Sequence, residues 1–436
     1  MYIEARWWKN KIKRKCKKMN SNSEASKKYF WGRFTNKMKI GQGGFAVVYK
    51  AYDNVEKRHV ALKVFPPSKA ASFFTEQALL KRLKNVPHIV NMYSSWAILP
   101  VKEAKRKEKR TYKNSDGRFK VFPDEYVIVM ELLRGKRLSD KQTLDLISRD
   151  HKHLRTVARE GLTALNEIHK RGVVHGDVKL DNITYEAETG IIMIDFGVSC
   201  VTLDVEESRR LGLLKVQCRP STAWIGTYTS FSPDRWLVIL MEHDFKRRGK
   251  RFEKMEWLNL EKYFKMMRKD DIFAFGTVLY ELMTRQRFPG IKPVPNPGLI
   301  QSTLKTPGIM VPSKFTNNYG KEKLYPLISA LLTSSYKNRP TASAALELLT
   351  SGKKWQVSKK SDGSKSEAER RELAKALTGR GGGASRSRSR RTGSGMTLTN
   401  SPVTIEDTLS TLTNSPVTLE NYPTASSWSF KSSSSK

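Results

Sequence analysis

The chain contains 436 residues, of which 38% are hydrophobic, so it can bury the core of one two-lobed domain and still carry tails. Its formal net charge of +38 indicates an acidic partner such as nucleic acid, a phosphoprotein or an anionic membrane surface. No run of about 18 apolar residues is present, and no apolar core follows the basic N-terminus, so we expect neither a membrane span nor a secretory signal. Cys16, Cys200 and Cys218 lack metal-type spacing, and we interpret them as reduced thiols of an intracellular protein.

Residues 1–28 form a lysine-dense head that carries the adjacent Trp7 and Trp8. A solvated, disordered head is the commoner outcome for such a segment. The alternative is a nuclear localisation or nucleic-acid-binding segment, in which the tryptophans stack on exposed bases.

The segment MKIGQGGFAVVY, residues 38–49, predicts a strand, a tight glycine turn and a second strand. Gly41 and Gly43 belong to this turn, and glycines let a backbone bring its N–H groups close to phosphates. The next predicted strand, residues 59–65, places Lys63 on the face opposite its valines and leucine. An isolated lysine of this kind is usually a surface residue.

A helix is predicted from about Ser68 to Lys84, because Phe73 and three leucines recur at roughly helical spacing. Glu76 is the only acid in this stretch and is expected to pair with a nearby lysine. The alternative is an exposed pair with Lys81 or Arg82 on the same helix. A basic stretch, residues 102–122, then reads as an exposed insertion before the buried strand YVIVMELL.

The most informative stretch is VVHGDVKLDNITY, residues 173–185, which is followed by IMIDFGVS. Asp177 would accept a proton from an attacking hydroxyl, and Lys179 would neutralise the transferring phosphoryl group. Asn182 and Asp195 are hard oxygen ligands suited to Mg²⁺. Together, these residues predict a site for a nucleoside triphosphate and its metal ions.

These motifs resemble the catalytic loop and the metal-binding loop of eukaryotic-type protein kinases, and the resemblance covers about residues 34–351. It implies an α+β, bilobal protein kinase-like fold with a small β-rich N-lobe, residues 29–132, and a larger helical C-lobe, residues 133–351. It also implies that Lys63 holds the α and β phosphates of ATP and that Glu76 pairs with Lys63. The other positions that the resemblance assigns to the nucleotide site are Ile40, Gly41, Gly43, Val48, Ala61, Met130, Glu131 and Leu133, with backbone hydrogen bonds to the adenine from Glu131 to Leu133.

Four positions depart from the family pattern. Ala46 occupies the third glycine position, and Thr184 replaces a leucine under the adenine, which implies an altered nucleotide affinity. Gly176 replaces the arginine that grips a phosphate on the activation segment, so constitutive activity is expected. Asp234 replaces a glutamate and is one methylene shorter.

The stretch GTYTSFSPD resembles the substrate-docking loop of the family. The resemblance implies that Thr227 contacts Asp177 and Lys179, as in serine/threonine rather than tyrosine kinases. It also implies a buried pair between Asp234 and Arg339, which is costly to break. Lys179, two residues after Asp177, and this downstream stretch argue against small-molecule kinases of the aminoglycoside phosphotransferase type, which share the HGD motif.

We expect ordinary exposed hydroxyls at Ser208, Ser221 and Thr222. The less favoured alternative is that they are phosphorylation sites. Residues 242–269 are predicted to form a basic insertion. The default expectation is a partly packed helical insert, and the alternative is a docking surface. A buried helix is predicted to begin at Asp271, which by resemblance braces the catalytic loop.

Residues 352–436 shift to serine, glycine, lysine and arginine, which predicts disorder. The alternating Arg-Ser run fits nonspecific nucleic-acid contact. Ser401 and Ser415 lie in two copies of TLTNSPVT, either as unmodified spacers or as substrates of a proline-directed kinase. The tail, the basicity and the insertions also resemble divergent kinases of large DNA viruses, including the baculovirus type.

We therefore predict an ATP- and Mg²⁺-dependent protein serine/threonine kinase whose protein substrates include basic, nucleic-acid-associated proteins. We expect a monomer that binds nucleic acid through its head and Arg-Ser tail, in the nucleus rather than the cytoplasm, or in a host nucleus if the chain is viral. The alternative is a kinase-like nucleic-acid-binding or scaffold module. Loss of Lys63, Asp177 or Asp195 would indicate that alternative, and all three are present.

Overall fold

The computed structural model describes residues 30–98, 111–113, 119–121, 124–247, 260–289 and 324–351, all within one unit of the chain, Met1–Arg380. The predicted head and tail lie outside the described residues, as does most of the predicted insertion at residues 102–122. Two short strands of that insertion are described, β5 (Thr111–Lys113) and β6 (Phe119–Val121), and they pair with each other.

The first lobe is built on a five-stranded antiparallel sheet in the order β1-β2-β3-β7-β4. Its strands are β1 (Phe34–Gln42), β2 (Val47–Asp53), β3 (Arg58–Phe65), β7 (Glu125–Glu131) and β4 (Met92–Ile98). Side chains alternate between the two faces of a strand. Leu62 and Val129 therefore pack in one apolar cluster, whereas Ala61 and Met130 pack in another. Lys63 lies two residues after Ala61 on β3, so its side chain is on the same face of the sheet as that of Ala61.

Helix α3 (Ala70–Arg82) follows a 3₁₀ turn, Pro67–Lys69, and packs against β7 and β4. It buries Phe73, Leu79 and Leu80, which lie at helical spacing. The helix lies within the predicted range, two residues shorter at each end. The unusual feature is a fully buried acid, Glu76, on the same helix.

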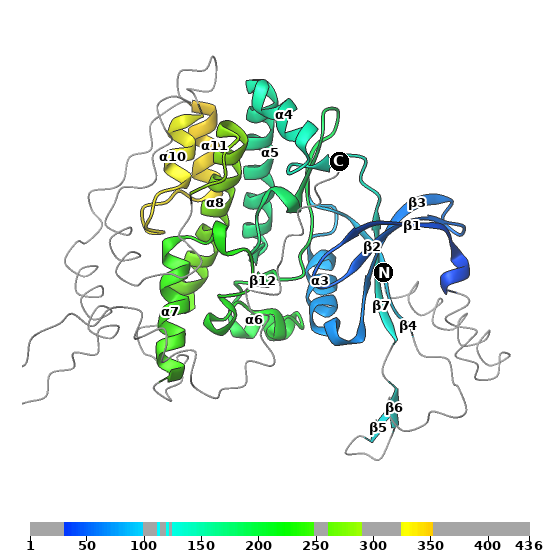
Figure 1. Ribbon diagram of the computed structural model, residues 1–436. Coiled ribbons are helices and arrows are strands. Elements are labelled where there is room, and N and C mark those ends of the chain that lie inside the picture. Colours follow the sequence, from blue (N-terminus) through cyan, green and yellow to red (C-terminus); the bar gives the residue numbers. More distant parts are fainter. Residues whose placement is uncertain are drawn as a thin grey trace, which may run out of the picture. The chain divides into compact units, whose positions relative to one another are not determined.

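The second lobe is mainly helical. Its helices are α4 (Lys141–Arg149), α5 (His151–Lys170), α6 (Val205–Arg210), α7 (Pro233–Arg247), α8 (Leu260–Thr284), α10 (Tyr325–Leu331) and α11 (Ala342–Ser351). Figure 1 shows α5, α8, α10 and α11 alongside one another, and they pack through shared contacts. In the described part of the chain, no helix has both the length and the apolar character that crossing a membrane requires.

Short strands in this lobe hold the loops of the candidate site. Strands β8 (Lys136–Arg137), β10 (Ile183–Glu186) and β11 (Gly190–Met193) form a three-stranded sheet. Strand β9 (Val173–Val174) pairs with β12 (Cys200–Val201). The 3₁₀ turns are Leu180–Asn182, Leu214–Val216, Pro220–Thr222 and Tyr228–Ser230.

Helix α5 leads the chain to the catalytic loop and has clear start and stop signals. Asp150 caps its first turn by accepting a hydrogen bond from the backbone N–H of Lys152. Gly172 lies just past its end with φ +68°, a left-handed conformation that favours glycine, and its N–H donates to the His169 carbonyl. The helix therefore ends directly before the turn at Arg171 and Gly172.

Helix α8 begins at Leu260, earlier than the start at Asp271 that the sequence suggested, and this expectation was wrong. Tyr263, Phe264 and Met267 continue its buried face toward the N-terminus. Because α7 also extends to Arg247, much of the predicted insertion at residues 242–269 consists of regular helices of the lobe. Only residues 248–259 separate α7 from α8, and they lie outside the described residues.

Candidate active site

Lys63 on β3 lies between two carboxylates from different parts of the chain. Its Nζ donates to both carboxylate oxygens of Glu76 on α3, at 2.8 and 2.7 Å, and to Oδ1 of Asp195 at 2.7 Å. The predicted pair with Glu76 is therefore present. Because Glu76 is fully buried, the alternative of an exposed pair within its own helix is wrong. The contact with Asp195 joins the first lobe to the metal-binding loop of the second.

Burial and charge oppose each other in this cluster. Burial disfavours the charge on Lys63, but the carboxylates of Glu76 and Asp195 outweigh it and raise the pKa of the ammonium. Burial, reinforced by the charge of Asp195 and opposed by Lys63, raises the pKa of Glu76 to about 7. Burial also opposes the charge on Asp195, but Lys63 prevails and lowers the pKa of that carboxyl to about 2. Asp195 is therefore ionised at neutral pH.

The carboxylate of Asp177 has one occupied and one free oxygen. Its Oδ2 forms an ion pair with Lys179 Nζ at 2.8 Å and accepts a hydrogen bond from Asn182 Nδ2 at 2.9 Å. Its Oδ1 is buried without a hydrogen-bond partner. A buried acceptor is costly to leave unpaired, and such exceptions call for an explanation. Here the free oxygen suits an incoming hydroxyl donor.

Lys179 also reaches the substrate-docking loop. Its Nζ donates to Thr227 Oγ1 at 2.8 Å. The contact expected between Lys179 and Thr227 is present, and it connects Asp177 to Thr227 through a single ammonium group.

Asn182 and Asp195, the predicted Mg²⁺ ligands, fit a site completed by substrate phosphates. Asn182 turns its Nδ2 toward Asp177, so its Oδ1 points elsewhere. Asp195 uses Oδ1 to bind Lys63, and its side chain remains 41% exposed. Within the described residues no group of three His, Cys, Asp or Glu could hold a metal by itself. Mg²⁺ often binds one or two carboxylates together with phosphate oxygens and water, so the two residues are compatible with it.

The residues assigned to the nucleotide site lie mainly on neighbouring strands. Gly41 pairs with Val48, and Ala61 pairs with Met130 in the middle of the sheet. Ile40 lies on β1 beside Gly41 and is 47% exposed. Gly43 lies in the turn between β1 and β2, where its N–H donates to the Ala46 carbonyl at 3.0 Å.

The last residue of β7, Glu131, takes part in two hydrogen bonds within the protein. The Glu131 N–H donates to the Asn91 carbonyl at 3.0 Å, and the Glu131 carboxylate accepts from the Asn91 N–H. This N–H is therefore occupied, and the backbone hydrogen bonds expected from Glu131 to Leu133 stay a prediction. In the described part of the chain, no backbone hydrogen bond outside the helices and strands involves Leu133, and its contact with an adenine stays a prediction.

Asp271, buried in α8, holds the backbone that precedes Asp177. Its two carboxylate oxygens accept from the N–H groups of His175 and Gly176, each at 2.8 Å. His169 Nε2 lies 2.9 Å from the same carboxylate. Burial alone would raise the pKa of Asp271, but these neighbours hold it below its usual value. The bracing role implied by resemblance thus has a direct structural basis.

The predicted pair between Asp234 and Arg339 is also present. Arg339 Nη2 lies 3.1 Å from Asp234 Oδ2, and the arginine is fully buried. Its other donors bind the carbonyls of Lys269, Thr333 and Ser334. Burial, opposed by Arg339, raises the pKa of Asp234 to about 6.

Arg235 is an important residue that the sequence did not reveal. Its guanidinium binds the carboxylate of Asp270 on α8 at 2.7 Å. It also donates to the carbonyl oxygens of Gly176, Ala223 and Ile225. This buried side chain therefore ties the catalytic loop and the docking loop to α8. Its only signal in the sequence is that the arginine directly precedes the apolar run WLVIL.

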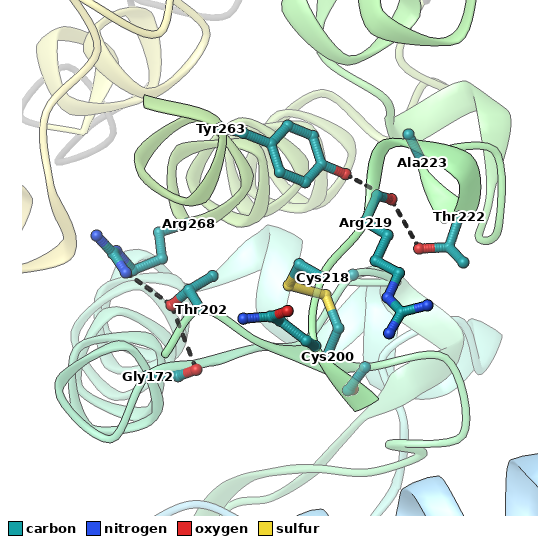
Figure 2. Close-up of a disulfide and its surroundings, with 12 residues drawn as sticks. Gly172, Cys200, Thr202, Cys218, Arg219, Thr222, Ala223, Tyr263 and Arg268 are labelled. Atoms are coloured by element: carbon teal, nitrogen blue, oxygen red, sulfur yellow. Dashed lines mark hydrogen bonds between the residues drawn. A yellow bond between two sulfur atoms is a disulfide. The ribbon is translucent and has the colours of Figure 1, made fainter. Parts of the chain in front are cut away.

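Two of the three cysteines are not free thiols. Cys200 and Cys218 form a disulfide, so their interpretation as reduced thiols was wrong (Figure 2). The two segments lie side by side, because the Cys218 N–H donates to the Val201 carbonyl at 2.8 Å. The Cα atoms are 4.9 Å apart, within the range that a disulfide can span. Spacing in the sequence does not reveal this proximity. Cys16 lies outside the described residues.

Ser208 also differs from expectation. It is fully buried on α6, and its hydroxyl bonds to the Leu203 carbonyl, so the prediction of an exposed hydroxyl was wrong there. Thr222 is exposed, and Ser221 is partly exposed.

Comparisons with known proteins agree with this geometry. Residues 34–222 match the family model of the protein kinase domain. The chain is 28% identical over 192 residues to the serine/threonine-protein kinase MST20 of Pyricularia oryzae, an alignment that covers 43% of this chain and 18% of that protein. It is 30% identical over 181 residues to the serine/threonine-protein kinase PAK 1 of Mus musculus, with 41% of this chain and 28% of that protein covered. It is 27% identical over 205 residues to the serine/threonine-protein kinase pakA of Talaromyces marneffei, with 46% and 26% covered.

The chain thus spans between 18% and 28% of the length of these curated relatives. The family match includes the glycine turn, Lys63, Glu76 and the loops that carry Asp177 and Asp195. A β-sheet lobe is followed by a helical lobe, as in a bilobal kinase. Residues 34–222 are thus similar to a protein kinase domain, the two lobes are consistent with a bilobal kinase fold, and these relatives are serine/threonine-protein kinases.

Proposed function

We propose that this chain is an active protein serine/threonine kinase, which transfers the γ-phosphoryl group of ATP to serine or threonine hydroxyls of proteins. The observation that carries the proposal is the contact of Lys63 with Asp195, which are 132 residues apart and come from different lobes. The free oxygen of Asp177 supplies the second requirement, an acceptor for the substrate proton.

Each polar group then has a role in the transfer. Asp177 Oδ1 accepts the hydroxyl proton as the oxygen attacks phosphorus, while Lys179 stays beside Asp177 to offset developing negative charge. Lys63 positions the α and β phosphates and is itself fixed by Glu76. Asn182 and Asp195 would hold Mg²⁺, which when bound neutralises phosphate charge. The contact between Lys179 and Thr227 supports the serine/threonine class.

The test compares Asp177→Asn with a matched control, Asp145→Asn. Asp145 lies on α4 and pairs with Arg285, away from the proposed chemistry. Radiolabelled phosphate transfer from ATP to a basic protein should fall by about 10²–10⁴-fold in the first variant. The control should retain wild-type transfer. Transfer by Asp177→Asn at the wild-type rate would refute the assignment.

Two further measurements address the alternatives. A kinase-like scaffold without activity would show no transfer and no Mg²⁺-dependent thermal shift with ATP. A small-molecule phosphotransferase would label low-molecular-weight acceptors in preference to protein. The proposal requires a Mg²⁺-dependent shift and protein labelling.

The net charge of +38 supports a finer proposal, contact with nucleic acid, because nucleic acid is an acidic partner. We infer that the substrates include basic, nucleic-acid-associated proteins, and that the monomeric chain binds nucleic acid through residues 1–28 and the Arg-Ser run. A nuclear location and an origin in a large DNA virus are part of the same proposal. Replacing the head lysines by glutamine should weaken nucleic-acid binding and reduce its salt dependence. Unchanged binding would remove the head from the proposal.

A further inference from the structure

The disulfide between Cys200 and Cys218 lies within the segment that runs from the metal-binding loop to the docking loop (Figure 2). Cys200 comes five residues after Asp195, and Cys218 comes nine residues before Thr227. The bond closes a loop that contains α6 and the 3₁₀ turn Leu214–Val216. It therefore connects the two ends of this segment covalently.

The Cys200 side of the bond is attached to the catalytic loop. Cys200 in β12 pairs with Val174 in β9, three residues before Asp177. The preceding residue, Ser199, donates its hydroxyl to the His175 carbonyl at 2.6 Å. Movement of Cys200 would therefore act on the backbone that positions Asp177.

The Cys218 side is attached to the docking loop. The carbonyl of the next residue, Arg219, accepts from Tyr263 Oη at 2.9 Å and from Thr222 Oγ1 at 2.8 Å, as Figure 2 shows. A few residues later, the carbonyl of Ala223 accepts from Arg235. The disulfide thus joins the support of Asp177 to the support of the substrate-docking loop.

The segment between Asp195 and Thr227 lacks the family's usual means of being held in place, so a disulfide can take over that role. Gly176 stands where the family has a phosphate-gripping arginine, so a phosphate on this segment would have no guanidinium at that position. Thr202 and Ser208 are the hydroxyl residues within the closed loop, and both are buried. A protein kinase could not reach them without opening the loop. A covalent bond between two cysteines can hold the segment without a phosphate-binding arginine and without an accessible hydroxyl to phosphorylate.

We propose that Cys200–Cys218 is a reversible thiol–disulfide exchange site that controls docking of the protein substrate. The oxidised form holds the segment in the arrangement that binds substrate, and reduction by a low-molecular-weight dithiol releases it. The kinetic consequence rests on the proposed kinase function, whereas the exchange chemistry and the release of the segment do not.

The exchange is expected to begin at the more exposed cysteine. Cys200 is partly exposed, whereas Cys218 is buried. A thiolate of the dithiol attacks Cys200 Sγ, the S–S bond breaks, and Cys218 leaves as a thiolate that takes up a proton. The second thiol of the reagent then attacks the mixed disulfide and releases Cys200 as a thiol. Two electrons and two protons pass to the protein, and the reagent becomes a cyclic disulfide.

Several contacts remain after reduction, so the kinase fold itself should persist. The Cys218 N–H still donates to the Val201 carbonyl, and Gln217 Nε2 to the Leu203 carbonyl at 2.9 Å. Arg268 still donates to Thr202 Oγ1 at 2.6 Å. The expected change is greater mobility of residues 201–226 rather than unfolding.

The experiment uses the full chain equilibrated in reduced or oxidised dithiothreitol, with the bond assigned by non-reducing peptide mapping. Reduction should raise the KM for a basic protein substrate by about fivefold or more, leave the KM for ATP unchanged, and speed amide hydrogen exchange in residues 201–226. The double variant Cys200→Ala with Cys218→Ala should match the reduced wild type in both buffers. The control Cys16→Ala should keep the wild-type response.

Two results would overturn the inference: Cys200 and Cys218 unlinked in oxidised buffer, or a bond that opens without change in the protein KM or in amide exchange. If neither redox form transfers phosphate, the proposed function fails, and amide exchange in residues 201–226 decides the redox inference separately. Loss of the response in Cys16→Ala would assign it to another thiol and also overturn the inference.

Discussion

Replacing Arg235 by methionine should destabilise the candidate active site more than any surface substitution. The guanidinium donates to Asp270 and to the carbonyls of Gly176, Ala223 and Ile225, at distances of 2.5 to 3.1 Å. A methionine side chain would occupy much of the same space, but it has no hydrogen-bond donor. The buried Asp270 carboxylate would keep the N–H of Ser232 but lose its cationic partner.

The size of the effect follows from this burial. Removing one partner of a buried ion pair costs about 3–5 kcal/mol, because the other charge stays buried without compensation. The lost hydrogen bonds to the three carbonyls are not added to this cost, because they come from the same guanidinium group. We therefore expect the free energy of unfolding to fall by about 3–5 kcal/mol in urea titrations. Arg235→Lys keeps a positive charge but cannot reach all four acceptors, so its loss should be smaller, about 1–3 kcal/mol.

A double-mutant cycle tests the reasoning directly. Asp270→Asn removes the charge that Arg235→Met would otherwise leave unpaired, so the two changes together should cost less than the sum of their separate costs. The KM for the protein substrate should also rise in Arg235→Lys, because the docking loop loses carbonyl contacts. Strict additivity in the cycle, or a loss below about 1 kcal/mol for Arg235→Met, would refute the argument.

Three further predictions concern single residues. Lys63→Met should abolish most phosphate transfer and the thermal shift with Mg²⁺ and ATP, since the two carboxylates beside it would repel each other and the phosphates; an unchanged shift would contradict this. Gly161→Ala should lower the free energy of unfolding by about 1–3 kcal/mol, although alanine normally favours a helix, because its Cβ would lie 2.1 Å from Phe275 Cζ; Gly32→Ala, which meets nothing within 4 Å, is the control in the same urea titration. Burial raises the pKa of Asp234 from 3.8 to about 6, so the folded state binds its proton more tightly; its contribution to stability is present below pH about 4 and is lost as the pH rises through about 6. Unfolding titrations across that range should show a larger loss in the wild type than in Asp234→Asn, because the loss from Glu76, whose pKa is raised to about 7, persists in the variant.

The sequence predicted those contacts of the site whose residues occupy positions in recognisable motifs. Lys63, Glu76 and Asp195 lie in short segments whose order and spacing indicate the fold, and the fold then brings them into contact. The pairs between Lys179 and Thr227 and between Asp234 and Arg339 followed in the same way. Such pairs are predictable because both partners occupy motif positions.

Features that depend on local packing were not predictable. Arg235 binds mainly backbone carbonyls, and any residue type presents a carbonyl, so its partners leave no mark in the sequence. The disulfide depends on β12 lying beside the segment that ends at Cys218, which is a tertiary contact across an irregular loop. The early start of α8 was missed because lysines and an arginine interrupt its apolar face, although their long stems can lie along apolar surface.

The glycine at position 176 connects these observations. Its φ of +76° is in the left-handed region, and its N–H and carbonyl are both occupied, by Asp271 and by Arg235 respectively. The backbone before Asp177 is therefore held from two sides by charged groups of the second lobe, and the strand pairing of Cys200 adds a third support. None of these supports requires a phosphate on the segment. A chain that lacks the family's phosphate-gripping arginine can thus still keep its proposed catalytic base in place, and only the support through Cys200 would depend on the state of the disulfide.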